Sequence, residues 1–384
     1  MRFEFATAAR IVFGAGSVRE VASAAAPLGR RALVVTGNSA DRAAPLIKDL
    51  NAAGVASFQI AVPGEPTLEL IRRSARDARD QHCDLVVAIG GGSALDTGKA
   101  LAALLTNPGD PLDYLEVIGR GQPLAHAAAP CIAIPTTAGT GSEVTRNAVL
   151  GSPEHRAKAS LRSAGMLPRV AVVDPELTLG LPPALTASTG LDALTQLIEP
   201  YVSARANPMT DAFCVDGMQR ASTALPRAWE NGSDREARES MSWAALLGGL
   251  ALANAGLGAV HGFAAPLGGM FSAPHGALCA AVLPHAMKVN LEALGARDPQ
   301  NPALRRYDEV ARLLTGSPHA VARDGVGWVA DLCQRLEIPP LRTYGVEPRH
   351  VPDLVEAARR TSSMKGNPVS LTSEELSQIV AEAI

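Results

Sequence analysis

The chain has 384 residues, 47% of them hydrophobic, which allows about two domains with buried cores and excludes a disordered or fibrous protein. Its 35 lysines and arginines nearly balance 38 aspartates and glutamates, and the net charge of -3 includes no basic block, so we expect neither nucleic acid nor a membrane as partner. The amino-terminal residues lack the signal-peptide pattern and no run of about 18 apolar residues occurs, which predicts a cytoplasmic protein.

The first half of the chain alternates short β-branched runs with helical stretches, a pattern typical of a parallel sheet wrapped by helices. The expected strands are residues 31–36, 57–62, 84–89, 131–135 and 170–173. After Asp174 the chain becomes rich in alanine and leucine with helical periodicity, as in residues 184–203, 208–229, 235–255 and 302–314. The sequence therefore predicts an α/β domain over residues 1–181 and an all-helical domain over residues 182–384.

Two glycine-rich elements compete for a phosphate-binding role. Gly14-Ala15-Gly16 resembles the start of a dinucleotide fingerprint, but Arg19 occupies the third glycine position, so a tight turn is the favoured interpretation. In the second element an apolar strand runs directly into Gly90-Gly91-Gly92-Ser93 and then into a helix, which aims backbone N–H groups and a helix N-terminus at one point. This arrangement suits a pyrophosphate.

The second glycine element has two other interpretations. It is a near miss for an ATPase P-loop, because Ser93 stands where a glycine is needed and Ala100 where a magnesium-binding hydroxyl is needed, and we reject that function. The glycines could also serve only a tight strand-to-helix turn. Favouring the cofactor site, the small hydroxyl and glycine residues 136–142 follow the next strand and are expected to form another wall of one crevice at the carboxyl edge of the sheet.

Candidate metal ligands occur in the helical half. Asp192 and Gln196 are four residues apart, so they share one face of a helix, and Glu199 lies close to that face. His261 and His275 each precede a glycine in apolar sequence. Either histidine alone is more typical of a hydrogen-bonded core residue, but one carboxylate with two imidazoles suits Fe²⁺ or Zn²⁺.

The five cysteines are widely scattered and form no CxxC pair, so they predict neither a disulfide framework nor a zinc knuckle. We interpret all of them as reduced core residues. They are Cys83, Cys131, Cys214, Cys279 and Cys333.

Several motifs together resemble the iron-containing alcohol dehydrogenase family, which has the dehydroquinate synthase-like fold. They occur in the family's order across nearly the whole chain: GGGSALDTGKA (90–100), PTTAGTGSEVT (135–145), DPELTLGLPP (174–183), HGxxxPLG (261–268) and PHG (274–276). The resemblance implies a Rossmann-like dinucleotide-binding domain, a helical domain for metal and substrate, and catalysis in a cleft between them. It also implies a homodimer or larger homo-oligomer.

In the family the metal ligands are an aspartate, a histidine four residues later and two further histidines. Carried over, these positions are Asp192, Gln196, His261 and His275, so Gln196 replaces a ligand histidine. An amide oxygen is a poorer ligand than imidazole for Fe²⁺ or Zn²⁺, which predicts a metal that is weakly held, exchanged or absent. Ala265 stands where the family has a further histidine near the nicotinamide.

The activity implied by the resemblance is hydride transfer between NAD or NADP and an alcohol, aldehyde or ketone, assisted by a divalent ion. Asp192, His261 and His275 would be the catalytic residues. The implied cofactor-binding residues are Gly37, Gly91, Gly92, Ser93, Asp96, Thr136, Thr137, Thr140 and Lys158. Gly37 stands where NAD-preferring members have an aspartate, so NADP or dual use is expected.

Three alternatives remain. The nearest is a reductase of the maleylacetate type that acts on an unsaturated or oxo acid, with or without metal. A lyase like dehydroquinate synthase is disfavoured because residues 256–287 contain no lysine or arginine for a substrate phosphate. The third is a cofactor-binding protein that has lost catalysis, which would explain both Gln196 and Ala265.

Overall fold

The computed structural model describes residues 2–38, 40–155 and 157–384, which form two compact units. The α/β unit comprises Ala6–Thr137 and Gly141–Thr178. The helical unit comprises Met1–Phe5, Ala138–Thr140 and Leu179–Ile384. Three residues of the threonine-rich loop thus belong to the helical unit. Gly139 packs so closely on Thr189 of that unit that an added Cβ would lie only 2.8 Å from Cβ of Thr189.

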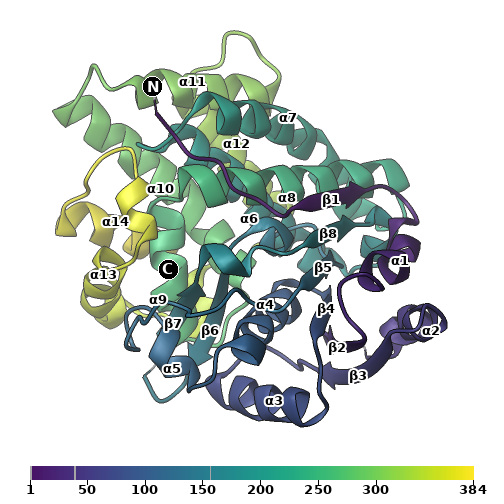
Figure 1. The fold of residues 1–384 in the computed structure, drawn as a ribbon. Helices are drawn as coiled ribbons and strands as arrows, with labels where there is room; N and C mark the ends of the chain where they lie inside the picture. The colour runs from purple at the N-terminus through teal and green to yellow at the C-terminus, as the bar shows by residue number, and fades with distance from the viewer. Residues whose placement is uncertain (1, 39, 156) are drawn as a thin grey trace. The chain divides into compact units, whose positions relative to one another are not determined.

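The α/β unit is built on a six-stranded parallel sheet, labelled in Figure 1. Its spatial order is β1 (Arg10–Phe13), β8 (Val170–Val173), β5 (Cys131–Pro135), β4 (Leu85–Gly90), β2 (Arg31–Thr36) and β3 (Ala56–Ala61). The central strands β4 and β5 are buried along their whole length, as expected for apolar runs covered on both faces by helices. The predicted parallel sheet is confirmed.

The chain reverses its direction of travel across the sheet between β2 and β4. From β2 it proceeds outward to the edge strand β3, then crosses back to β4 and continues to β5 on the other side. Such a switch point leaves a crevice outside the carboxyl ends of the two strands, where open α/β sheets bind ligands. Gly37 follows β2 and Gly91 follows β4, so both lie at this point.

Two cores cover the two faces of the sheet. One contains the apolar sides of α3 (Leu68–Asp80) and α4 (Gly92–Thr106), and the other contains those of α1 (Val21–Ala25) and α2 (Ala44–Ala52). A short helix, α5 (Pro111–Tyr114), and an antiparallel hairpin of β6 (Asn147–Ser152) and β7 (Ala157–Arg162) complete the unit.

The helical unit surrounds one buried helix, α6 (Pro183–Val202), which packs against α7, α8 and α10. From Thr186 onward nearly every α6 residue is buried, as expected for a helix that is apolar on most sides. The other helices are α7 (Pro208–Glu230), α8 (Arg235–Ala255), α9 (Ala259–Met270), α10 (His275–Arg297), α11 (Pro302–Thr315), α12 (Ala322–Arg335), α13 (Val351–Arg359) and α14 (Ser373–Ala383).

Among the described residues, no single helix is long and apolar enough to cross a membrane. The pair α8 and α9, bent by 99° relative to each other, meets the length and composition criteria only when taken together.

Candidate functional site

The triple glycine lies at the start of α4 in the α/β unit. No side chain caps this helix, whose N-cap is Gly91, so its first N–H groups are available to an anion. The backbone approaches closely here: a Cβ on Gly90 would lie 3.1 Å from the backbone nitrogen of Gly37. Further along α4, a Cβ on Gly98 would lie 2.5 Å from that of Ala88, so this glycine lets the helix pack directly on β4.

Polar side chains behind the glycine loop fix the neighbouring loop rather than face solvent. Asp96 accepts hydrogen bonds from Ser142 Oγ at 2.6 Å and from the backbone N–H of Val149 at 2.9 Å. The ammonium of Lys99, whose side chain is fully buried, lies 3.1 Å from Asp96 Oδ1 and donates to the carbonyl of Ser142 and to Thr145 Oγ1. These contacts hold the segment after β5 against α4.

Of the other predicted cofactor residues, Thr136 and Thr137 directly follow the carboxyl end of β5. The N–H of Thr136 donates to the carbonyl of Gly90 at 2.9 Å, and the side chain of Thr137 lies about 3.5 Å from the Cβ position of Gly91. Lys158 lies on β7, where its ammonium pairs with Glu65 at 3.0 Å. Thr140 is grouped with the helical unit.

The first glycine pair forms a turn that is already satisfied internally. The N–H groups of Gly16 and Val18 both donate to the carboxylate of Asp174, at 3.1 and 3.2 Å. Gly14 and Gly16 adopt positive φ values of 141° and 77°, which is the conformational freedom that glycine provides. The prediction of a tight turn is confirmed, although the flanking strand β1 was not predicted.

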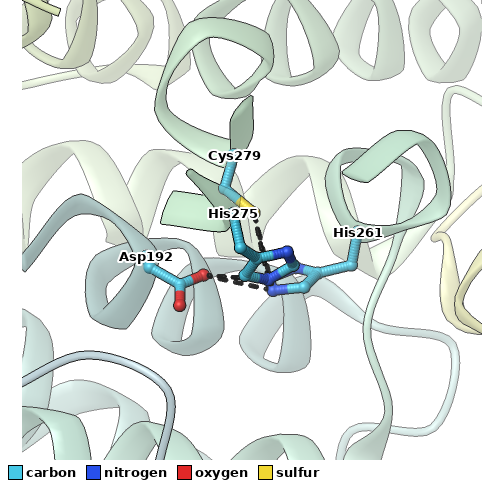
Figure 2. A group of neighbouring side chains, drawn as sticks. All are labelled: Asp192, His261, His275 and Cys279. Carbon is cyan, nitrogen blue, oxygen red and sulfur yellow. Dashed lines mark hydrogen bonds and ion pairs between the residues drawn. The ribbon is translucent and has the colours of Figure 1, made fainter. Parts of the chain in front are cut away.

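Four potential metal ligands converge inside the helical unit, as Figure 2 shows. Asp192 comes from the middle of α6, His261 from the first turn of α9, and both His275 and Cys279 from the start of α10. One donor atom from each lies within 4.8 Å of the others. Asp192 Oδ1 is 3.4 Å from His261 Nε2 and 3.7 Å from His275 Nε2. Cys279 Sγ is 3.9 Å from His261 Nε2 and 3.6 Å from His275 Nε2.

These separations fit a divalent ion. Ligand bonds of about 2.0–2.3 Å in tetrahedral geometry place donor atoms about 3.3–3.8 Å apart. Asp192 Oδ1 is buried and has no hydrogen-bond partner among the described residues, which is costly unless a cation satisfies it. The donor set and the unsatisfied carboxylate oxygen both match a metal centre.

Glu199 orients one of the ligands. Its Oε2 lies 2.7 Å from Nδ1 of His261, and since a carboxylate can only accept, Nδ1 carries a proton, which leaves Nε2 as the atom that would bind an ion. The other oxygen of Glu199 accepts from the N–H of Val260 at 2.8 Å. The sequence placed Glu199 near the ligand face, and the structure shows why it matters there.

The cluster favours the protonated form of its histidines. Burial lowers the pKa of His275, but Cys279 and Asp192 raise it to about 9. Burial likewise opposes protonation of His261, and Cys279, Asp192 and Glu199 outweigh it, so the pKa of His261 lies well above its usual value. For Asp192, burial raises the pKa while His275 and His261 lower it by more. Positive charge is therefore stabilised at this point.

Cys279 was not predicted to be a ligand, and Gln196 was expected as the fourth member of the group. All five cysteines are free, as predicted, but Cys279 is also part of the donor group. The four converging groups do not include Gln196, whose Oε1 is buried without a hydrogen-bond partner in the described chain and faces Gly248 of α8. The replacement of a ligand histidine by Gln196 therefore has no support. The available signal was the four-residue spacing from His275 to Cys279 on one helix.

The glycine after His275 lets α10 approach α6. A Cβ on Gly276 would lie 2.3 Å from the carbonyl oxygen of Ser188, a backbone atom that cannot rotate away. We expect Gly276→Ala to lower the free energy of unfolding by about 1–3 kcal/mol and to displace His275. Gly295→Ala on the same helix is the matched control, because Gly295 is exposed with nothing within 4 Å, and alanine there is expected to stabilise the helix. Equal stability of the two variants in urea unfolding would contradict this account.

Comparisons with known proteins cover the whole chain. The family profile described as "Iron-containing alcohol dehydrogenase" matches residues 8–175, and "Fe-containing alcohol dehydrogenase family, C-terminal" matches residues 186–384. Alcohol dehydrogenase 4 of Saccharomyces cerevisiae is 37% identical over 337 residues, covering 88% of this chain and 84% of the yeast protein. NAD-dependent methanol dehydrogenase of Bacillus methanolicus is 34% identical, covering 97% of each chain. A crystal structure of a 1,3-propanediol oxidoreductase matches with a TM-score of 0.92 at 32% identity, covering 100% of both chains.

Proposed function

Because the chain belongs to the iron-containing alcohol dehydrogenase family, and is thus a nicotinamide-dependent, metal-assisted oxidoreductase, we propose that it interconverts short primary alcohols and their aldehydes. The observation that carries this proposal is the convergence of Asp192, His261 and His275 in the helical unit. The substrate class is supported by the names of similar proteins, which act on methanol and 1,3-propanediol.

We assign the two units separate tasks. The α/β unit would bind the dinucleotide through the N–H groups of Gly91, Gly92 and Ser93, supported by the uncapped start of α4 and its dipole. The helical unit would hold the metal ion and the substrate. Asp96 and Lys158 remain candidates for the ribose side, and Thr136, Thr137 and Thr140 for the nicotinamide side.

A bound divalent ion would supply a Lewis acid that polarises the carbonyl of an aldehyde or stabilises the alkoxide of an alcohol. The protein supplies the anionic ligand Asp192 and the imidazoles of His261 and His275, with Glu199 fixing the tautomer of His261. The His275 side chain is 36% exposed, whereas Asp192 is 1% exposed, so substrate would reach the cluster from the side of His275. Ala265 has no side-chain group that could accept a proton, so the hydroxyl proton would pass to water or to a cofactor hydroxyl.

The finer properties of the site are also proposals. The ion is Fe²⁺ or Zn²⁺, which carboxylate and imidazole ligands suit. We propose a homodimer or larger homo-oligomer, as the family resemblance implies. We also propose a cytoplasmic location, which the five free cysteines support.

The choice of cofactor is expected to depend on Gly37. No carboxylate stands there to repel a 2′-phosphate, so we propose that NADP is accepted as well as NAD. A Cβ on Gly37 would meet nothing within 4 Å, so aspartate fits, and Gly37→Asp is expected to lower kcat/KM for NADP at least about tenfold relative to NAD. Gly64→Asp, in an exposed loop with equal space, is the control. A wild-type preference for NAD above about a hundredfold, or 2.7 kcal/mol, would contradict NADP use.

The proposed function is tested with the metal-loaded full chain and a panel of primary alcohols, aldehydes and oxo acids, using both cofactors before and after chelation. Turnover of alcohols that chelation abolishes and metal restores would support the proposal. Faster reduction of unsaturated or oxo acids, unaffected by chelation, would instead favour the maleylacetate type. Cofactor binding without any turnover would indicate a protein that has lost catalysis.

A further inference from the structure

We infer that Cys279 is a thiolate ligand of the metal ion and that it makes the site selective for Zn²⁺ over Fe²⁺. The inference rests on the proposed function only insofar as that function places an ion in the Asp192 cluster. It concerns which atoms hold the ion and which metal they favour, and it is testable without measuring catalysis.

The position of Cys279 is fixed by its helix. Residues 275 and 279 are four apart on α10, so His275 and Cys279 project from the same face, one turn apart. Cys279 is fully buried, and its Sγ lies 3.6 Å from Nε2 of His275 and 3.9 Å from Nε2 of His261. Figure 2 shows the sulfur between the Cys279 backbone and the histidine rings, directed at the imidazoles.

An independent observation points to a ligand at this position. Oδ1 of Asp192 is directed into the same cluster and has no hydrogen-bond partner in the described residues, although the residue is 1% exposed. A buried carboxylate oxygen is costly without a positive partner, and a bound cation would supply one. None of the other four cysteines belongs to such a group in the part of the chain that the structure describes.

The chemistry of the donor set favours zinc. Thiolate is a soft ligand that zinc accepts readily in tetrahedral sites with imidazole and carboxylate, and a shared N/O/S site binds Zn²⁺ more tightly than Fe²⁺. On binding, the Cys279 thiol releases its proton to solvent, since thiolate is the ligating form.

The net charge of the site also favours a thiolate ligand. One thiolate and one carboxylate offset the two positive charges of the ion, while both imidazoles stay neutral. An aspartate with three imidazoles would leave one positive charge uncompensated among the ligands. Because Asp192 and Cys279 are both buried, the compensated set is the less costly one to form.

The direct test is X-ray absorption on the full-length wild-type protein, stripped with a chelator and reloaded with Zn²⁺. The expected spectrum contains one sulfur at about 2.3 Å together with nitrogen and oxygen ligands at about 2.0–2.2 Å. This measurement needs no variant, so it does not depend on how a substituted protein folds. A shell of nitrogen and oxygen ligands only would overturn the inference.

Cysteine variants of the Co²⁺-substituted protein show which sulfur binds the metal ion. In the Co²⁺-substituted protein we expect a near-ultraviolet thiolate-to-cobalt charge-transfer band that Cys279→Ser abolishes. Cys333→Ser is the matched control, because Cys333 packs on α10 through a contact of its sulfur with the carbonyl of Ala280 but lies outside the donor group. Gln196→Ala is expected to keep the band as well. Retention of the band in Cys279→Ser would overturn the inference.

Competition for metals tests the selectivity. We expect Cys279→Ser to weaken Zn²⁺ binding by more than about 100-fold, beyond the 10- to 100-fold typical of a lost supporting contact. The loss for Fe²⁺ is expected to stay below about tenfold, because iron gains less from a soft ligand. Equal losses for both metals would overturn the selectivity.

Turnover of alcohols, measured on the same samples, separates this inference from the proposed function. A sulfur shell in a protein that turns over no alcohol would support thiolate ligation and contradict the proposed function. Alcohol turnover by a protein whose metal has no sulfur ligand would do the reverse.

Discussion

Replacing Asp192 with asparagine is expected to lower kcat/KM for alcohols at least about 1000-fold, because the loss of a Lewis acid removes several kcal/mol of transition-state stabilisation. Asp192 is the only anionic oxygen ligand in the described donor group, and the imidazoles on either side lie within 3.7 Å of its Oδ1. The neutral amide would leave the ion with weaker attraction in a buried site. We therefore expect kcat/KM, measured by kinetics, and the metal content, measured by elemental analysis, to fall together in the purified variant.

The control for this prediction is Glu236→Gln at the start of α8, whose side chain is 78% exposed and pairs only with Arg227 at the surface. It removes a carboxylate of the helical unit without touching the donor group. Stoichiometric metal and undiminished turnover in Asp192→Asn would show that the cluster is not the catalytic centre.

The second large effect is expected on the free energy of unfolding, which should depend on pH because of Glu143. This residue is 2% exposed, and its Oε2 has no hydrogen-bond partner among the described residues. Burial raises the pKa of Glu143 to about 7, although its own backbone N–H and Lys99 lower it. The folded protein thus keeps this proton to higher pH than the unfolded chain, whose carboxyl titrates near the ordinary glutamate pKa of 4.5.

The direction in which the free energy of unfolding changes with pH follows from the number of protons that each state binds. The folded state binds more protons than the unfolded state between about pH 4.5 and 7, so Glu143 lowers the free energy of unfolding as the pH rises through that range. The total loss is on the order of 3 kcal/mol and is complete above about pH 7. Glu143→Gln has no such proton and should be more stable than the wild type at pH 8, but not at pH 4.5.

Urea unfolding at several pH values measures this difference. Glu154→Gln, at an exposed position of the same unit, should follow the wild-type pH dependence and serves as the control. Parallel curves for wild type and Glu143→Gln would mean that the carboxyl is not buried in its neutral form.

The sheet was predictable because its central strands are continuous apolar runs, buried on both faces, that end in glycine or proline. The hairpin of β6 and β7 was not predicted, since its strands bury only alternate residues and include Gly151 and Lys158. The edge strand β1 is half-exposed and short, and it is defined by pairing with β8, more than 150 residues away in sequence. Local periodicity cannot report such a pairing.

The candidate metal ligands likewise include some that the sequence predicted and one that it did not. Asp192, His261 and His275 could be named because carboxylate and imidazole next to glycine are recognisable in sequence. Cysteine spacing could not place Cys279 in this candidate group, because its neighbours there are two histidines and an aspartate brought together by the packing of α6, α9 and α10. The same packing directs Gln196 towards Gly248.

All four donor side chains come from helices of the helical unit, and none comes from the glycine loops of the α/β unit. Metal uptake therefore requires folding of residues from one unit only. We therefore expect binding of the ion to be independent of the nucleotide, because none of its candidate donors lies in the glycine loops.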